Sequence, residues 1–114
     1  MKIIGLTRIR NEADIIQETL DHMSDFCDGG IFVYDDSSTD NTLEICQSHP
    51  SVTHVIAGNS WSHDRETAEF ENRQALLEYA QKHAGPQDWF VYMDADERLE
   101  FDWESLHQLK ADIV

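Results

Sequence analysis

The apolar residues of this chain gather in four short runs, and longer segments between the runs carry apolar residues at helical spacing. Each run is nearly continuous, as in strands that are buried on both faces of a parallel sheet. The predicted strands are Lys2–Thr7, Ile31–Tyr34, Val52–Ala57 and Trp89–Met93. Helices are predicted over about 12–26, from about 43 to 48, over about 67–84 and from about 102.

This alternation of strand and helix predicts the α/β class, with a Rossmann-like, doubly wound, mainly parallel sheet and helices on both faces. A length of 114 residues predicts one domain over 1–114. The loop from Gly58 through Trp61 and His63 is long and polar, as functional connections are. No helix cap marks Val114, so we expect a truncated sheet whose open edge and uncovered apolar face favour a homo-oligomer.

The net charge of the chain limits the classes of ligand that it is expected to bind. It has 23 Asp and Glu against 8 Lys and Arg, which gives a net charge of −15. This balance argues against nucleic acids and anionic membranes, and an anionic ligand would need a metal ion to bridge it to the acidic protein. Arg8 interrupts the N-terminus too early for a signal peptide, and no apolar run spans a bilayer, so we expect a cytoplasmic protein with Cys27 and Cys46 as buried free thiols.

Acidic residues follow two of the predicted strands. Asp94 and Asp96 come after the fourth strand, and a bend at Ala95 would turn both carboxylates toward one point. Two such hard oxygen ligands suit Mg²⁺ or Mn²⁺. We expect Asp96 to bind the metal and Asp94 to be a second ligand or to contact a ribose hydroxyl. Because carboxyl ends of parallel strands share one edge, a site is predicted there.

The second strand ends at Asp35 and Asp36. A carboxylate in this place can accept a hydrogen bond from a nucleobase N–H, and Asp36 is the first candidate for that role, with Asp35 the second. The residues that follow, Ser38 to Thr42, are of the types that cap helix N-termini. A cap and a binding site can coexist in this segment.

Arginines supply the basic groups near the predicted edge. Arg8 and Arg10 follow the first strand, where they either pair with phosphate or stack on a base, or neutralise neighbouring acids. Arg73 lies on the apolar stripe of the third helix with Phe70 and Leu77. Its side chain either extends to the rim of that helix or faces the acidic site.

Four segments together resemble the nucleotide-binding half of family 2 glycosyltransferases of the GT-A fold, in the same order and at similar spacing. They are Asn11-Glu12, Val33–Thr42, Asn72-Arg73 and Val91–Asp96. The resemblance covers essentially the whole chain. It implies an enzyme that transfers a sugar from a nucleotide diphosphate sugar to a hydroxyl of a saccharide or lipid-linked acceptor, with inversion.

The family pattern also implies roles for single residues. By that pattern Asp36 contacts the base, Glu12 and Arg73 line the nucleotide pocket, Asp94 reaches the ribose or the sugar, and Asp96 holds the metal on the diphosphate. Arg8 and Arg10 stand where family members often have Pro-x-Tyr, so the identity of the nucleotide stays open.

Family members run to about twice this length, and their catalytic base and acceptor site lie in the second half, so no general base is assigned. Two alternatives remain from other classes of protein. One is a receiver-like signalling module with an Mg²⁺-binding acidic cluster. The other is a non-catalytic relative that binds a nucleotide or a divalent cation.

Overall fold

The computed structural model describes residues 2–58 and 65–95. The predicted metal ligand Asp96, the loop residues Trp61 and His63, and the predicted last helix lie outside these ranges.

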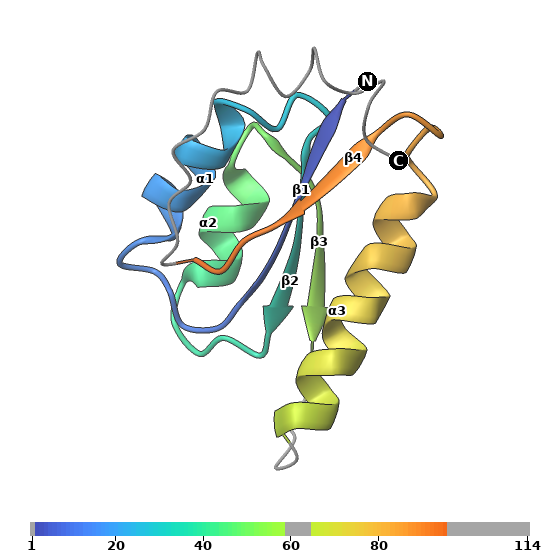
Figure 1. Ribbon diagram of the computed structural model, residues 1–114. Coiled ribbons are helices and arrows are strands. Elements are labelled where there is room, and N and C mark those ends of the chain that lie inside the picture. Colours follow the sequence, from blue (N-terminus) through green and yellow to red (C-terminus); the bar gives the residue numbers. More distant parts are fainter. Residues whose placement is uncertain (1, 59–64, 96–114) are drawn as a thin grey trace.

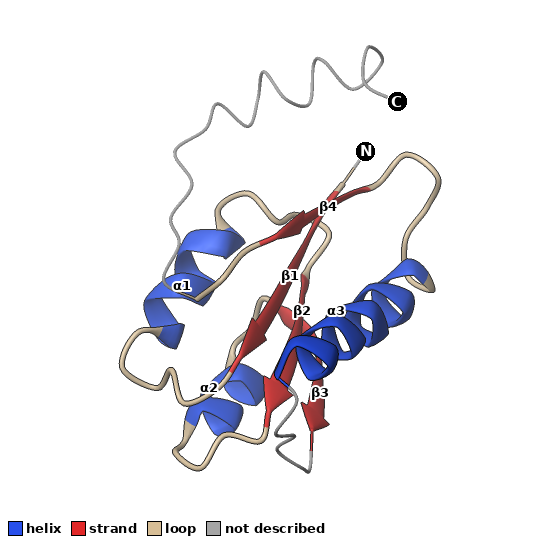
Figure 2. Ribbon diagram, turned by 60° about the horizontal axis from the view of Figure 1, so that its bottom comes forward, coloured by secondary structure: helices blue, strands red, loops and turns tan. Residues whose placement is uncertain are grey.

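The described residues form a parallel sheet between helices (Figure 1). The strands are β1 Ile3–Ile9, β2 Ile31–Asp36, β3 Val52–Gly58 and β4 Trp89–Tyr92, and the helices are α1 Ile16–Ser24, α2 Thr42–Ser48 and α3 Arg65–Gln81. The strand order is β3-β2-β1-β4, and each neighbouring pair is parallel. Figure 2 shows α1 and α2 on one face of the sheet and α3 on the other. The predicted doubly wound α/β fold is therefore confirmed.

The connection order locates the edge at which ligands bind in such folds. The chain winds outward from β1 to β2 and β3 on one side, and then crosses to place β4 on the other side of β1. Open α/β sheets bind ligands outside the carboxyl ends of their strands, at the point where the winding reverses. In this protein that point lies at the carboxyl ends of β1 and β4.

Two apolar layers hold the sheet between its helices. Alternate residues of a strand point to opposite faces, and both faces are covered, which explains the nearly continuous apolar runs in the sequence. The layer under α1 and α2 contains Ile3, Ile9, Ile31, Val33, Ile16, Leu20, Met23 and Cys46. The layer under α3 contains Ile4, Leu6, Phe32, Leu76 and Ala80.

Two helix boundaries differ from the sequence prediction by more than two residues. Helix α1 begins at Ile16 rather than near Glu12, and residues 13–15 form a turn before it, in which the N–H groups of Ile15 and Ile16 both bond the Glu12 carbonyl. Helix α3 ends at Gln81, since residues 82–84 continue as turns with bonds to the third residue back.

The thiols are confirmed as buried and free. Burial, reinforced by the negative charge of a nearby aspartate, raises the pKa of both Cys27 and Cys46 to about 12. Both side chains therefore stay protonated at neutral pH.

Among the described helices, none combines the length and the apolar character that crossing a bilayer requires.

Gly30 tests the fold at the start of β2. Its φ is +96°, and an added Cβ would collide with the hydroxyl of Thr53 on β3. We expect Gly30→Ala to lower the free energy of unfolding by about 2 kcal/mol, since both the backbone and the contact become strained. The urea midpoint measures this change.

Gly85→Ala is the matched control, because its added Cβ would lie 3.6 Å from the carboxylate of Asp88, an ordinary contact. An equal loss of stability in both variants would contradict the interpretation of Gly30.

Candidate functional site

The strands β1 and β2 both lead into residues with left-handed backbone at the carboxyl edge. Asn11 has a φ of 52° and Ser37 a φ of 59°. Such values are uncommon outside glycine, and they persist only where surrounding contacts enforce them. The two turns redirect the chain directly after the strands, so the last strand residues stand at the edge.

The side chain of Asn11 joins the two turns. Its Oδ1 accepts hydrogen bonds from the N–H of Thr39 at 2.7 Å and from the N–H of Asp40 at 3.3 Å. In return, the N–H of Asn11 donates to the hydroxyl of Ser38 at 2.9 Å. The loop after β1 is thereby fixed to the loop after β2.

A second set of bonds runs through Asp40 and Thr42. The carboxylate of Asp40 accepts from the N–H of Thr42 at 2.9 Å and from the hydroxyl of that residue. The Thr42 hydroxyl accepts from the N–H of Glu12 at 2.9 Å, and the Ala13 N–H donates to Asp40 at 3.4 Å. We call Asn11, Ser38, Thr39, Asp40 and Thr42 the loop staple.

The loop staple changes the interpretation of this segment. The sequence predicted a helix cap, and the Thr42 N–H is indeed bonded by Asp40. However, the N-cap residue Asn41 makes no side-chain cap bond. Most of the side-chain bonds go to the loop after β1, a partner that residue type alone does not reveal.

The two acids at the end of β2 face opposite sides of the sheet. Asp35 is buried toward α2, and its carboxylate accepts from the hydroxyl of Ser38 at 2.5 Å and from the Ser38 N–H at 3.2 Å. Its contacts favour a structural role in the turn. Asp36 points to the α3 side, so these two predicted site residues do not converge.

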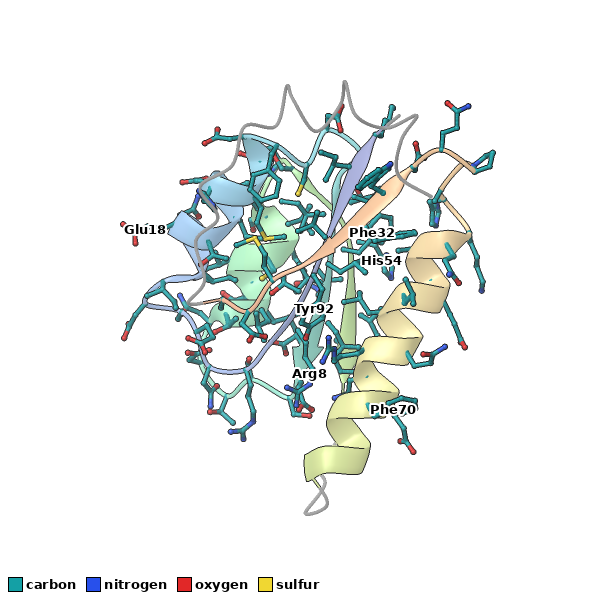
Figure 3. The ribbon with its side chains drawn as sticks, in the orientation of Figure 1. Arg8, Glu18, Phe32, His54, Phe70 and Tyr92 are labelled. Atoms are coloured by element: carbon teal, nitrogen blue, oxygen red, sulfur yellow. The ribbon has the colours of Figure 1, made fainter. Side chains whose placement is uncertain are left out.

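Asp36 forms an ion pair with Arg8. The Arg8 Nη2 lies 2.6 Å from Oδ2 of Asp36, and the exposed fractions of the side chains are 17% for Arg8 and 3% for Asp36. Figure 3 shows Arg8 at the carboxyl edge of the sheet, near the end of β2. Burial and the charge of Asp36 together raise the pKa of the neighbouring Tyr34. Arg8 therefore neutralises a neighbouring acid, and whether it also contacts a nucleotide stays a prediction.

Asp94 is held at the edge by its neighbours. Met93 and Ala95 are buried on the α1 side, and the Met93 N–H donates to the carbonyl of Leu6 at 3.0 Å. The hydroxyl of Thr19 on α1 donates to the carbonyl of Ala95. The side chain of Asp94 between them is exposed. The predicted bend at Ala95 is thus an anchored turn that presents Asp94 to solvent.

Arg10 and Glu12 lie directly beyond the end of β1, and both are half-buried. Their position agrees with the predicted place of both residues near the carboxyl edge. Whether they contact a nucleotide stays a prediction.

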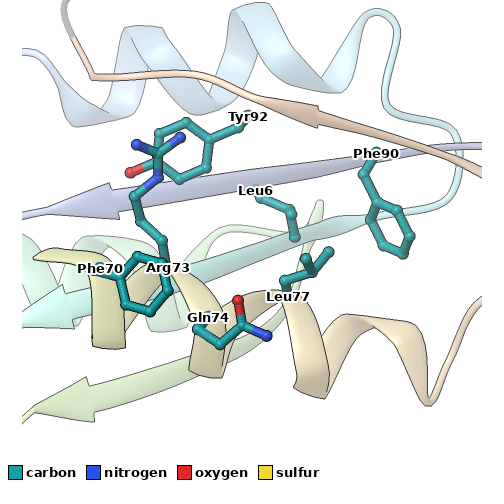
Figure 4. A pocket seen from close by; sticks show the side chains of 7 residues that line it. All are labelled: Leu6, Phe70, Arg73, Gln74, Leu77, Phe90 and Tyr92. Carbon is teal, nitrogen blue, oxygen red and sulfur yellow. The ribbon is translucent and has the colours of Figure 1, made fainter.

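An open groove of 620 Å³ lies between α3 and β4 (Figure 4). Its lining residues are Leu6, Phe70, Arg73, Gln74, Leu77, Phe90 and Tyr92. Arg73 places its guanidinium carbon 4.1 Å above the centre of the Tyr92 ring, a favourable cation–π arrangement. Arg73 therefore extends to the rim of the groove, where the aromatic ring holds it.

Two groove residues were not expected from the sequence in this role. Phe70 was assigned to the buried stripe of its helix, but it is 69% exposed. Tyr92 was assigned to a buried strand and is half-buried. The sequence did contain a signal for Tyr92. Residues two apart on a strand share a face, so Tyr92 lies on the same side of the sheet as Asp94, two positions further on.

The described residues at the carboxyl edge supply only some of the ligands that a divalent metal ion needs. Within residues 2–58 and 65–95, no group of three or more His, Cys, Asp or Glu side chains is placed to hold a metal. Asp94 supplies an exposed carboxylate. One or two carboxylates suit Mg²⁺ or Mn²⁺, because such an ion takes its other ligands from water and phosphate.

The sheet order defines the class of doubly wound α/β proteins, in which ligands bind at the carboxyl edge of the sheet. Comparison with known families gives the specific assignment: the chain belongs to glycosyl transferase family 2, whose model matches residues 7–109. The receiver-like alternative is wrong, since that fold has the strand order 2-1-3-4-5 rather than the order seen here.

Two mycobacterial relatives are similar over most of this chain. They are the uncharacterized proteins Mb3815c of Mycobacterium bovis and Rv3786c of Mycobacterium tuberculosis, each 34% identical over 102 residues. The match covers 90% of this chain and 25% of each relative. This chain therefore spans about a quarter of the length of these relatives.

Among solved structures, the crystal structure of residues 1–349 of TarS from S. aureus is similar, with a TM-score of 0.67. The match covers 97% of this chain and 32% of that chain, at 24% sequence identity. At this identity the likeness shows the fold alone, which is the GT-A fold.

The loop staple can be tested at Asn11. Asn11→Ala removes the acceptor for two backbone N–H groups. It also places alanine, which adopts left-handed backbone less readily than asparagine, at a positive φ. We expect a loss of about 2 kcal/mol in the free energy of unfolding and faster amide exchange at Thr39. Urea titration and hydrogen exchange measure both changes.

Asn11→Asp keeps a side-chain acceptor and tolerates the same backbone, so we expect a clearly smaller effect from this variant. Unchanged exchange at Thr39 in Asn11→Ala would show that the staple does not fix the loop.

The staple also makes a prediction about pH. The hydroxyl of Thr42 is the main cause that holds the pKa of Asp40 below its ordinary value of 3.8. A lowered pKa contributes stability above 3.8, and this contribution is lost as the pH falls through the lower folded-state value. We expect Thr42→Val to move the pKa of Asp40 back up.

Carboxyl NMR titration of Asp40 measures that change. The urea midpoint should also fall less between pH 6 and pH 3 in the variant than in the unmodified protein. Identical titration of Asp40 in both proteins would refute the assigned cause.

Proposed function

We propose that this chain is the donor-binding domain of a metal-dependent, inverting glycosyltransferase. In this proposal it binds a nucleotide diphosphate sugar with Mn²⁺ or Mg²⁺, and the sugar passes to a hydroxyl of a saccharide or lipid-linked acceptor. Membership of glycosyl transferase family 2 supports glycosyl transfer in general. The metal, the donor and the stereochemistry are the parts that the proposal adds.

The observation that carries the proposal is the placement of Asp94. Its carboxylate is exposed at the point where the winding of the sheet reverses, and buried, hydrogen-bonded neighbours fix the backbone on both sides. A chain with a net charge of −15 repels a diphosphate unless a cation lies between them. Asp94 is well placed to hold that cation, and the family pattern adds Asp96.

When bound beside Asp94, a divalent ion would neutralise the negative charge that develops on the leaving diphosphate. The residues of the chain itself bind and orient the donor. Arg10 and Glu12 lie beside the same edge, and Arg73 lies at the rim of the neighbouring groove. In the proposal Glu12 and Arg73 line the nucleotide pocket, and Asp94 also reaches the ribose or the sugar.

Calorimetry tests this function directly. We expect at least one of UDP, GDP and CDP to bind in the presence of Mn²⁺ and to bind much more weakly after the metal is removed with a chelator. Asp94→Asn should weaken the Mn²⁺-dependent binding by at least about tenfold, because the amide is a poorer ligand than the carboxylate.

Asp25→Asn removes the same charge from an exposed residue at the C-terminal end of α1, and we expect it to bind like the unmodified protein. Absence of binding with all three nucleotides would refute the proposal. Binding that does not depend on metal would support the non-catalytic alternative instead.

A further inference from the structure

Helix α1 carries a polar residue, Thr19, at a position where its packing would favour an apolar one. The buried residues of this helix are Ile16, Thr19, Leu20 and Met23, and Thr19 is 0% exposed. Burial of a hydroxyl costs free energy unless the hydroxyl is hydrogen-bonded, and the β-branched threonine is a poorer helix former than leucine or methionine. Neither packing nor helix propensity therefore accounts for a threonine in this place.

The hydroxyl of Thr19 lies between two carbonyl groups. One belongs to Ile15, at 3.1 Å, and the other, which is closer, belongs to Ala95. A hydroxyl has a single hydrogen to donate, and the Ile15 carbonyl already accepts the N–H of Thr19 at 3.0 Å. The hydroxyl hydrogen therefore goes to Ala95, and the bond joins α1 to the turn after β4.

This bond acts where the pairing of β4 ends. The register of β4 with β1 runs as far as Tyr92, which is opposite Leu6. Ala95 lies three residues further on, is 5% exposed and packs in the apolar layer under α1. Both the methyl group and the carbonyl of Ala95 are thus held from the side of α1.

The anchored residue determines how Asp94 is presented. Met93 and Ala95 are buried on the α1 side, and Asp94 between them is exposed. A carboxylate whose direction is already set binds a metal ion more tightly, because the cost of ordering it is not subtracted from the affinity. Residues that orient a ligand group from behind therefore tune metal affinity without touching the ion.

We propose that Thr19 is a positioning residue for the cation site: its hydroxyl holds the Ala95 carbonyl and thereby fixes the direction of the Asp94 carboxylate. This inference rests on the proposed function and deepens it, because it adds a residue of α1 that acts on the cation only through the turn. A residue that breaks the local preference of its helix is expected where function requires it.

Two substitutions separate the hydroxyl from the rest of the side chain. Thr19→Val keeps the β-branched shape and removes the hydroxyl, whereas Thr19→Ser keeps the hydroxyl and removes the methyl group. We expect Thr19→Val to weaken Mn²⁺ binding, measured by calorimetry with UDP, GDP and CDP, by about fivefold, as for one lost neutral hydrogen bond. Thr19→Ser should bind Mn²⁺ within about twofold of the unmodified protein, because it keeps that bond.

Stability distinguishes positioning from support of the fold. Thr19→Ser loses a buried methyl group, so its urea midpoint should fall although its Mn²⁺ affinity is kept. A merely structural role would make the Mn²⁺ affinity follow the urea midpoint. Loss of Mn²⁺ affinity in Thr19→Ser together with the midpoint would overturn the inference.

Thr7→Val is the matched control. Thr7 on β1 is 0% exposed and faces the same apolar layer as Ile3 and Ile9. Its hydroxyl has no hydrogen-bond partner in the part of the chain that the structure describes. We expect Thr7→Val to bind Mn²⁺ like the unmodified protein, and an equal loss in Thr7→Val and Thr19→Val would contradict the assigned role.

A measurement without metal or nucleotide follows the turn itself. Nitrogen relaxation NMR reports the fast motion of the backbone N–H groups of Asp94 and Ala95. We expect lower order parameters at both residues in Thr19→Val than in Thr19→Ser and the unmodified protein, because the turn has lost its bond to α1. Unchanged order parameters in Thr19→Val would overturn the inference.

A double variant tests whether Thr19 acts through Asp94. In a protein that already carries Asp94→Asn, we expect Thr19→Val to cause no further loss of Mn²⁺ binding, and additive losses would overturn the inference. Unchanged Mn²⁺ affinity in Thr19→Val alone would overturn the inference and leave the proposed function standing. Absence of metal-dependent binding by the unmodified protein would overturn both.

Discussion

The whole arrangement depends on the burial of β1. This strand is hydrogen-bonded to β2 on one side and to β4 on the other, and apolar layers cover both of its faces. Charged groups cannot be accommodated along such a strand without a large desolvation cost. They are confined to its ends, and at the carboxyl end Arg8 meets Asp36 beside the point where the winding of the sheet reverses.

At that edge, two different interactions hold the site. The loop staple joins the turns after β1 and β2 through backbone N–H groups, and its bonds hold Asn11 in left-handed backbone. The ion pair between Arg8 and Asp36 compensates a buried charge on the α3 side of the sheet. The staple therefore fixes the positions of the loops, and the ion pair orients the Arg8 guanidinium.

The acidic composition and the anionic donor of the proposed function are compatible because the charges are distributed unevenly. The acids at the end of β2 are engaged, Asp35 by Ser38 and Asp36 by Arg8. Asp94 is exposed at the same edge. In the proposed function, a cation held there would allow a diphosphate to approach. The groove beside it, with Arg73 over Tyr92, adds a cationic and aromatic surface next to the edge.

The sequence by itself determined the fold class and the edge. Continuous apolar runs indicate strands covered on both faces, and acids directly after those runs must lie at their ends, because both conclusions depend only on local spacing. Only the tertiary structure decided that Arg8 pairs with Asp36, that Asn11 bonds the loop after β2, and that Phe70 is exposed. These features depend on which distant segments meet, and residue spacing along one segment carries no information about its partners in space.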